Sequence, residues 1–358
     1  MRSGAERLAL AALALALAAF PGAATAQTVR PVYREIGDWL IACDNTRNCL
    51  ARQANDPARA MADGEDEDVG IDIARNAGPN GVIEVRLRAE HRLDPAALHA
   101  SGQAPLTRLP WRRSGDGQDA TLSGEPARRF VRTIVDAPRL MLASKGASHL
   151  PLRGLAAVLL AMDEAQGRVG NASALMRPGS SPAGATPPPV QPPLVRVAPA
   201  APPLANARAL VAAVRRLHAR TFAAHACDRD PGSDDAAYPI TAADAIVVIG
   251  CGRFAYQTSV LVFRTPRDRP AAATLLRLPD PPVAPTDAES AGEYVGGSYD
   301  PATRTFSETA KGRGMADCGR ATEWTFDGKA FHLSAFRWQD RCGGVAPGDW
   351  PILYRTRR

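Results

Sequence analysis

The chain has 358 residues, a formal net charge of +6 and six cysteines. This length exceeds the usual domain size of about 100–200 residues, so we expect two domains, each large enough to bury its own core. The basic residues are almost all arginine and are scattered among acids rather than gathered into a patch. Composition therefore does not predict a nucleic-acid-binding protein, and it leaves contact with a phosphorylated lipid or an acidic glycan open.

The first residues predict an export signal. A short basic start precedes an apolar run over residues 8–20 and a triplet of small residues that ends at Ala26. This three-part pattern is typical of a secretory signal peptide over residues 1–26, with cleavage after Ala26. The apolar run of about 13 residues is shorter than the roughly 20 that a membrane-spanning helix needs. We therefore expect a soluble periplasmic protein with no transmembrane segment, a compartment that also excludes nucleic acid as a partner.

Residues 27–177 are expected to form an α+β domain. Residues 37–53 contain two short apolar runs tied at a turn, and residues 68–90 show period-two alternation on both sides of a breaker run. Such alternation predicts a β-hairpin with one buried face. Residues 126–137 and 151–168 are typical of helices, with Leu152 and Leu155 at the start of an apolar face.

Residues 178–203 differ from their surroundings because they are crowded with proline and carry almost no charge. Proline cannot donate to a β-ladder and favours the polyproline II conformation, so this segment is expected to be a semi-rigid linker. A docking site for a proline-binding partner is the alternative interpretation.

Residues 204–358 are expected to form a second, mainly antiparallel β domain with a leading helix. An apolar stripe that includes Val214 and Leu217 predicts an amphipathic helix from residue 204 to about 224. Apolar runs at residues 245–251 and 254–264 then predict strands. A further hairpin is expected to turn at Asp327 and Gly328, because an Asp-Gly pair tolerates the positive φ angles of a tight turn.

The cysteines predict structural disulfides. Disulfides persist outside the reducing cytoplasm, so an even number of cysteines in an exported chain favours three bridges. Locality favours Cys43 with Cys49, Cys227 with Cys251, and Cys318 with Cys342, although the sequence alone allows other pairings. No closely spaced cysteine pair indicates a structural zinc site. The stretch His225 to Cys227 would permit a metal ligand set or a thiol nucleophile only if Cys227 were free.

The stretch "KGRGMADCG", residues 311–319, is the strongest candidate site. Lys311 and Arg313 lie among glycines, and a glycine-rich basic loop can hold an anion through its backbone N–H groups. A loop that turns sharply to aim Cys318 at Cys342 needs the same glycines, so a structural brace is the favoured interpretation. An anion or ligand contact at Lys311 and Arg313 is the alternative.

Other chemistry is weakly represented in the sequence. The acidic run from Asp63 to Asp68 offers carboxylates to calcium, but its spacing does not fit an EF-hand loop. No P-loop, dinucleotide fingerprint, nucleophile elbow or zinc-protease helix is present. We therefore expect no cofactor, no metal and no catalytic residue.

Several segments resemble the domain of unknown function 1176 family, a group of exported bacterial proteins with six cysteines. The resemblance lies in "GDWLIACDNTRNCLA", "LRGLAAVLLAMDEAQGRVG", "KGRGMADCG", "EWTFDGKAFHL" and "GDWPILYRT". The first half is also similar to the invasion-associated locus B family through Asp38, Trp39, Cys43 and Cys49. These resemblances imply export, structural cysteines and an envelope location, and they transfer no activity.

The expected function is that of a non-enzymatic envelope binding or interaction protein stabilised by disulfides. Its partner would be an envelope protein or an anionic envelope component. A periplasmic hydrolase or an anion-binding protein is the alternative. A hydrolase requires an acid, a base or a nucleophile that converge in a cleft, whereas an interaction protein exposes an apolar or aromatic patch.

Overall fold

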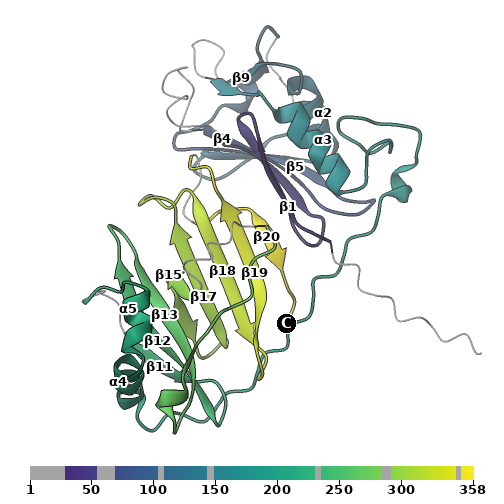
Figure 1. Cartoon of the computed structure of the whole chain (residues 1–358). Helices are drawn as coiled ribbons and strands as arrows, with labels where there is room; N and C mark the ends of the chain where they lie inside the picture. Colours follow the sequence, from purple (N-terminus) through teal and green to yellow (C-terminus); the bar gives the residue numbers. More distant parts are fainter. Residues whose placement is uncertain are drawn as a thin grey trace, which may run out of the picture.

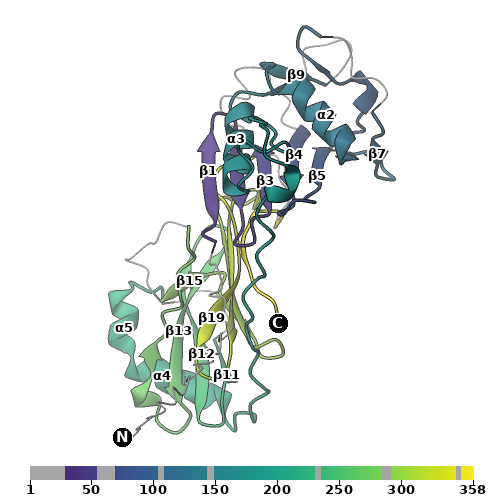
Figure 2. The same cartoon turned by 90° about the vertical axis from the view of Figure 1, so that its right-hand side faces the viewer.

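The structure is a computed structural model that describes residues 29–54, 69–103, 109–142, 149–229, 235–283, 292–343 and 348–358. The expected signal peptide and the acidic run from Asp63 to Asp68 lie outside these residues. The described elements form two lobes stacked end to end, which we call the N-terminal lobe (up to residue 177) and the C-terminal lobe (from residue 204) (Figure 1, Figure 2). The expected β-rich α+β fold is confirmed, while the domain boundaries themselves stay a prediction.

The N-terminal lobe is built on an antiparallel sheet. Its strands are β1 (Val32–Ile36), β2 (Trp39–Cys43), β3 (Cys49–Gln53), β4 (Val69–Arg75), β5 (Ile83–Ala89), β7 (Arg112–Arg113) and β8 (Asp119–Ser123). Among the described residues they lie in the order β1-β2-β3-β4-β5-β8-β7. A smaller sheet contains β6 (His99–Ala100), β9 (Arg139–Met141) and β10 (His149–Pro151), and the helices are α2 (Glu125–Ile134) and α3 (Leu155–Ala165). The strand pairs predicted over residues 37–53 and 68–90 are confirmed as β2–β3 and β4–β5.

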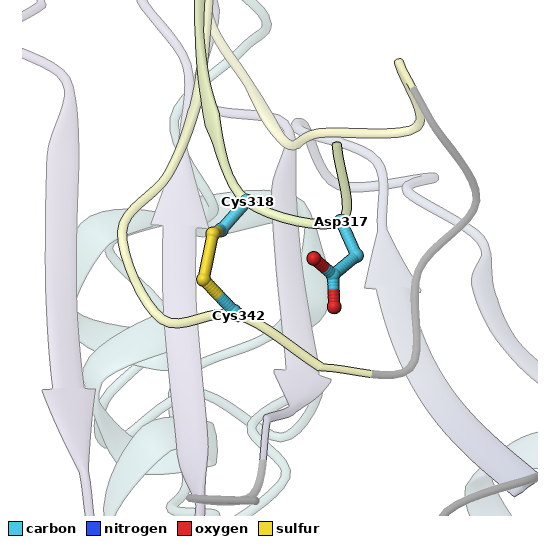
Figure 3. A group of neighbouring side chains, drawn as sticks. All are labelled: Asp317, Cys318 and Cys342. Carbon is cyan, nitrogen blue, oxygen red and sulfur yellow. A yellow bond between two sulfur atoms is a disulfide. The ribbon is translucent and has the colours of Figure 1, made fainter. Parts of the chain in front are cut away.

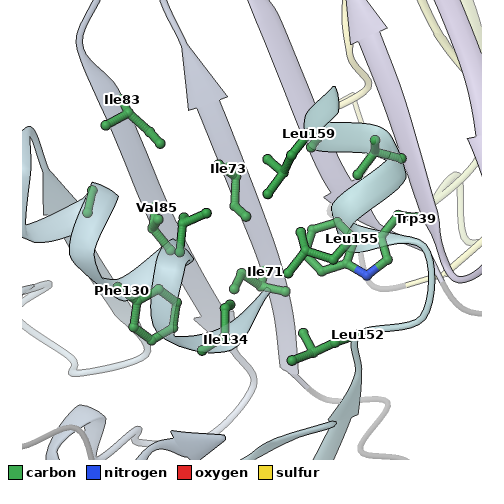
Figure 4. Close-up of a cluster of buried hydrophobic side chains, with 14 of the residues drawn as sticks. Trp39, Ile71, Ile73, Ile83, Val85, Phe130, Ile134, Leu152, Leu155 and Leu159 are labelled. Carbon is green, nitrogen blue, oxygen red and sulfur yellow. The ribbon is translucent and has the colours of Figure 1, made fainter. Parts of the chain in front are cut away.

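Helices α2 and α3 cover one face of the large sheet. Alternate residues of the strands point at these helices, and they bury a common apolar core with Phe130 and Ile134 of α2 and with Leu155 and Leu159 of α3 (Figure 4). Helix α3 begins after Gly154, whose φ of +98° ends the preceding turn. A Cβ at Gly154 would lie 2.0 Å from the backbone oxygen of Ile36, so only glycine fits there.

The other face of the same sheet contacts the C-terminal lobe. Leu40 and Ala42 of β2 pack with Phe336 and Leu353 in one buried cluster. The predicted hairpin at residues 68–90 is therefore wrong in one respect, because β4 is buried on both faces instead of one. Arg52 of β3, Asp72 of β4 and Arg88 of β5 are joined by ion pairs on this face, and Arg52 and Arg88 also pair with Asp349.

The C-terminal lobe is a layered β structure. Its helices are α4 (Ala207–Leu217) and α5 (Ala219–Ala224), and its strands are β11 (Ala236–Pro239), β12 (Asp244–Arg253), β13 (Thr258–Pro266), β14 (Thr274–Leu275), β15 (Glu293–Val295), β16 (Ser298–Asp300), β17 (Thr305–Lys311), β18 (Gly319–Phe326), β19 (Phe331–Gln339) and β20 (Ile352–Arg355). Strands β11 to β15 form one sheet and strands β16 to β20 form the other. An aromatic core fills the space between the sheets, and α4 packs on the outer face of the first sheet.

Two sequence predictions for this lobe need correction. The helix expected from residue 204 to about 224 is two helices, because the backbone leaves helical geometry at His218. Leu217 is 49% exposed and so does not belong to the buried stripe. The strand expected over residues 254–264 begins only at Thr258, which leaves Phe254 and Tyr256 in the preceding turn.

The proline-rich segment runs in an extended conformation from the N-terminal lobe along the C-terminal lobe (Figure 1, Figure 2). Its backbone is hydrogen-bonded on the way: Val195 N donates to Arg357 O at 2.9 Å, and Ala198 N donates to Phe326 O at 3.0 Å. Its role as a linker stays a prediction, but these bonds hold it against the second lobe. No helix in the described parts of the chain is long and apolar enough to cross a membrane.

Candidate functional site

The hairpin loop between β17 and β18, residues 311–319, is closed by covalent and hydrogen bonds. Gly312 N donates to Cys318 O at 2.9 Å, and Ala316 N donates to Arg313 O at 2.9 Å. Cys318 is joined to Cys342 by a disulfide (Figure 3). The other two bridges are Cys43–Cys49 and Cys227–Cys251, so the pairs are those that locality favours.

The glycines of the hairpin loop have different roles. A Cβ on Gly312 would lie 2.6 Å from Cys318 Sγ, closer than non-bonded atoms approach, so the disulfide requires glycine there. A Cβ on Gly314 would lie 3.7 Å from the nearest ring atom of Tyr256, which is an ordinary contact. The brace interpretation therefore accounts for Gly312 and does not account for Gly314.

Arg313 and Lys311, the two predicted anion contacts, differ in their bonding partners. The Arg313 guanidinium is bonded to the Asp317 carboxylate, with Nε donating to Oδ1 at 2.7 Å and Nη2 donating to Oδ2. This hydrogen bond holds the pKa of Asp317 below its ordinary value. Lys311 ends β17, and its backbone pairs with the side chain of Gln257, with Lys311 N donating to Oε1 at 3.0 Å. Arg313 thus serves the loop, while the Lys311 ammonium group has no partner among the described residues.

The inner side of the hairpin loop reaches the N-terminal lobe through Gln339. The side-chain amide of Gln339 donates to Asp317 O at 3.3 Å, and its Oε1 accepts from Arg52 Nη1 at 3.1 Å. Arg52 forms an ion pair with Asp72 at 2.8 Å and donates to the backbone oxygen of Asp349 at 2.6 Å. We call Arg52, Asp72, Gln339 and Asp349 the junction network, since it joins the two lobes.

Charge pairing stabilises the junction network despite its burial. Arg52 is 2% exposed and Asp72 is 7% exposed. Burial by itself raises the pKa of Asp72, but the charge and hydrogen bonds of Arg52 together with the charges of Arg88 and Arg86 outweigh it, so the net pKa is lowered. Both groups are therefore ionised at neutral pH, and removal of either would leave a buried charge with fewer partners.

Asp317, Cys318 and Cys342 also form a group whose ligand atoms lie within 4.8 Å of one another in the described chain. Thiolates are strong metal ligands, but here the two sulfur atoms are bonded to each other (Figure 3). The Asp317 carboxylate is bonded to Arg313 as well. The arrangement is thus a structural brace.

The outer side of the hairpin loop carries an exposed apolar surface. Phe254 is 48% exposed, Tyr256 is 43% exposed and Met315 is 66% exposed. Phe254 and Tyr256 belong to the turn between β12 and β13, which Phe254 N closes by donating to Gln257 O at 2.8 Å. Met315 follows Gly314, where an added Cβ would lie 3.7 Å from the Tyr256 ring. We call these three residues the aromatic patch.

The turn and the hairpin loop are bonded to each other. Tyr256 Oη donates to Gly312 O at 3.1 Å, and Gln257 Nε2 donates to Lys311 O at 3.3 Å. Cys318 fixes the loop from the opposite side through its disulfide. The aromatic patch is therefore presented on a frame whose parts hold one another in place.

A serine, a carboxylate and a histidine lie beneath the same turn. Ser259 Oγ donates to Glu293 Oε1 at 2.5 Å, and Glu293 Oε2 lies 3.7 Å from His225 Nδ1. A nucleophilic serine must give its proton to a base and be open to substrate. Ser259 is fully buried, its Oγ accepts from Gly252 N at 2.8 Å, and it contacts the carboxylate instead of the imidazole. This cluster ties β15 to its neighbours and does not form a nucleophile–base pair.

The interpretation of His225 to Cys227 as a metal or thiol site does not fit the structure. Cys227 is bonded to Cys251, so it offers no thiol. His218, which lies between α4 and α5, has its Nε2 atom 3.2 Å from the backbone oxygen of Pro270. The disulfide instead fixes the segment that runs beside the turn, where Asp228 N donates to Cys251 O at 2.7 Å.

Sequence reasoning missed Phe254 and Tyr256 as surface residues because both fit an apolar strand. One signal was present: the predicted strand at residues 254–264 was longer than the usual 5–6 residues or so. Two long strands that follow each other directly also need a turn between them, and that turn had to come from residues 252–257. Nothing in the sequence marked Met315 as exposed.

The fold and the site define a β-rich protein with disulfide-braced loops and an exposed aromatic surface. A family model described as "Protein of unknown function (DUF1176)" matches residues 33–357, so the chain belongs to this family and the expected family resemblance is confirmed. The chain is 27% identical over 347 residues to the uncharacterized protein YpfG of Escherichia coli (strain K12). The aligned region covers 91% of this chain and 94% of YpfG. No solved structure matches the chain. The comparisons do not show the similarity to the invasion-associated locus B family.

Proposed function

We propose that this protein is a non-enzymatic binding protein of the bacterial envelope, exported to the periplasm, that recognises a partner through the aromatic patch. The observation that carries the proposal is the exposure of Phe254, Tyr256 and Met315 at adjoining positions of two braced loops. Apolar surface gains roughly 25 cal/mol per Å² when it leaves water, so a partner that covers these side chains gains affinity. Grouped exposed apolar residues mark interaction sites more often than single ones do.

The frame of the aromatic patch supports the same conclusion. Binding costs less when the contacting side chains are already held in their bound positions. Tyr256 is fixed through its hydroxyl group, and Met315 lies in the hairpin loop that Cys318 anchors. The exposed turn is thus built as a preorganised surface and not as a loose connection.

The compartment is part of the proposal. Three disulfides are most stable outside the reducing cytoplasm. The leader-like residues before Gln27 favour export. Cell fractionation followed by N-terminal sequencing of the exported chain tests this point: a periplasmic product that starts at Gln27 is expected, and an uncleaved cytoplasmic product would contradict it.

Site-specific photo-crosslinking in the native cells tests the binding surface. A photoreactive phenylalanine analogue is placed at Phe254, at Tyr256 or at Met315 in separate variants. Leu217 on α4 is a matched control, because it is exposed to 49% and lies away from the aromatic patch. We expect one discrete crosslinked partner from the patch positions and none from the control.

The crosslinked partner is then identified, purified and measured for binding to the isolated protein. Replacement of both Phe254 and Tyr256 by serine should abolish this binding, whereas Leu217→Ser should leave it unchanged. Equal crosslinking from Leu217 and the patch, or unchanged binding of the double variant, would show that the aromatic patch is not the recognition surface.

A further inference from the structure

We infer that the partner presents an acidic peptide segment with apolar side chains to the aromatic patch. This inference rests on the proposed function and specifies the chemistry of the partner. It follows from the charges around Phe254, Tyr256 and Met315, which the apolar contacts alone do not explain.

Three cationic residues lie on the segments that carry or adjoin the aromatic patch. Arg253 precedes Phe254 in the same turn and is exposed, and Lys311 begins the hairpin loop. Arg229 is exposed on the segment that Asp228 N fixes beside Cys251. Among the residues that the structure describes, the side chains of Arg229, Arg253 and Lys311 form no ion pair. In the described part of the chain, no carboxylate neutralises the charge of these three side chains.

The carboxylates near the patch are hydrogen-bonded to neighbouring groups of the protein. Asp228 Oδ2 accepts from Arg253 N at 2.8 Å, and Asp317 is bonded to Arg313. Glu293 accepts from Ser259 and faces His225. Arg313 neutralises Asp317, whereas Asp228 and Glu293 keep their negative charge. Because Arg229, Arg253 and Lys311 have no ion pair among the described residues, these charges sum to a small positive excess, which we call the positive rim and which favours a negatively charged partner.

The residue types favour a peptide over a sugar chain. Phenylalanine, tyrosine, methionine and arginine are enriched at protein interfaces, and the patch with Arg253 consists of these types. Methionine adapts its shape to apolar side chains, and Met315 is the most exposed residue of the patch. In an acidic segment that alternates carboxylates with apolar side chains, the carboxylates can pair with the cations of the rim while the apolar side chains pack on the aromatic patch.

Fluorescence polarisation with the purified exported chain tests the inference. The probe is a short labelled peptide that alternates glutamate with leucine and phenylalanine, and it is compared with a peptide that carries lysine in place of glutamate. A third peptide keeps the glutamates and replaces the apolar residues by serine. We expect the first peptide to bind at least about tenfold more tightly than the other two, with affinity that falls as salt is added.

Charge reversal on the protein provides the second arm. Arg253→Glu combined with Lys311→Glu should weaken the first peptide at least about tenfold. Arg208→Glu on α4 is the matched control, because Arg208 is exposed and lies in a different part of the lobe. Circular dichroism of each variant establishes that it is folded, and Arg253→Gln replaces the double variant if that one unfolds.

Each of three peptide-binding results would overturn the inference: equal binding of the lysine peptide, equal binding of the serine peptide, or unchanged affinity of the charge-reversed protein. Tighter binding of polygalacturonate than of the first peptide would overturn it in favour of an acidic glycan. Photo-crosslinking from Phe254 does not depend on the charge of the partner. If crosslinking succeeds and the first peptide shows no preferential binding, the acidic-peptide inference is wrong while the proposed function stands. If neither experiment gives the expected result, the inference and the proposed function are both wrong.

Discussion

The turns at the two ends of the C-terminal lobe are stabilised in different ways. At the end far from the N-terminal lobe, the turn between β18 and β19 uses Asp327, whose Oδ1 accepts from Lys329 N at 2.7 Å and from Ala330 N at 2.8 Å. At the end next to the N-terminal lobe, the turn after β12 carries Phe254 and Tyr256. Two disulfides, Cys227–Cys251 and Cys318–Cys342, are found at that end.

The two turns differ in whether their side chains are explained by the fold alone. The far turn satisfies its own backbone with a short polar side chain and a glycine at φ +105°, which is sufficient for a hairpin. The near turn exposes apolar side chains that a hairpin does not require, and it depends on bonds to the hairpin loop. Residues that break a local rule without a structural gain are expected at functional sites. The near end is therefore where the proposed binding surface lies.

Removal of the brace should give the largest effect. Replacing Cys318 and Cys342 together by serine should lower the free energy of unfolding by about 3 kcal/mol, because the bridge closes a loop with a sequence separation of 24. The Cys43–Cys49 bridge, with a separation of 6, is a matched control and should cost less. Urea unfolding measures both. An unchanged unfolding midpoint in the Cys318 variant would show that the hairpin loop needs no brace.

The glycines of the hairpin loop give the next largest effect. Gly312→Ala should destabilise the protein by about 2 kcal/mol, because the new Cβ overlaps Cys318 Sγ. Gly314→Ala should stay within about 0.5 kcal/mol of the parent, since its Cβ meets Tyr256 at an ordinary distance. Thermal unfolding of the two variants side by side is the measurement. Equal losses would mean that the disulfide does not dictate the loop conformation.

A third pair of variants compares the two turns directly. Gly328→Ala at the far end should cost about 1 kcal/mol, because its φ of +105° is unfavourable for any residue with a Cβ. Phe254→Ser at the near end should change the free energy of unfolding by about 0.5 kcal/mol or less, as expected for an exposed side chain. The same variant should lose partner binding. A large loss of stability in Phe254→Ser would place Phe254 in the fold and not in a recognition surface.

Local sequence patterns predicted much of the fold. The hairpin β4–β5 followed from strict alternation, and the turn at Asp327 followed from the Asp-Gly pair. Locality also favoured the cysteine pairs that the structure contains. These features depend on residues near in sequence, so a single sequence carries the information that they need.

The contacts between the lobes were not predictable in the same way. The hairpin over residues 68–90 was expected to have one buried face, because alternation does not tell which face a second lobe will cover. The burial of Asp72 with Arg52 was therefore not predictable. Arg52 pairs with Gln339 across 287 residues of sequence, a contact that no local pattern contains. The aromatic patch was missed for a related reason: an apolar run fits a strand until the neighbouring strand fixes where the turn must lie.

The smallest predicted effect is a pH dependence that differs between the two ends. The backbone N–H groups of Ala330 and Lys329 lower the pKa of Asp327 from 3.8 to about 2. The hydrogen bond from Arg313 lowers the pKa of Asp317 below the same ordinary value. A carboxyl group with a lowered pKa in the folded state stabilises the protein fully above its unfolded pKa, and it loses this contribution as the pH falls through its folded pKa.

The free energies of unfolding of Asp327→Asn and Asp317→Asn should therefore differ from that of the parent by a constant amount above about pH 5, and this difference should shrink in stronger acid. Urea unfolding as a function of pH measures it, and a difference that grows toward acid would contradict the sign. The two ends are told apart by the second readout. Asp317→Asn releases Arg313 and loosens the hairpin loop, so it should weaken photo-crosslinking from Met315, whereas Asp327→Asn should leave that crosslinking unchanged because its turn lies at the opposite end of the lobe.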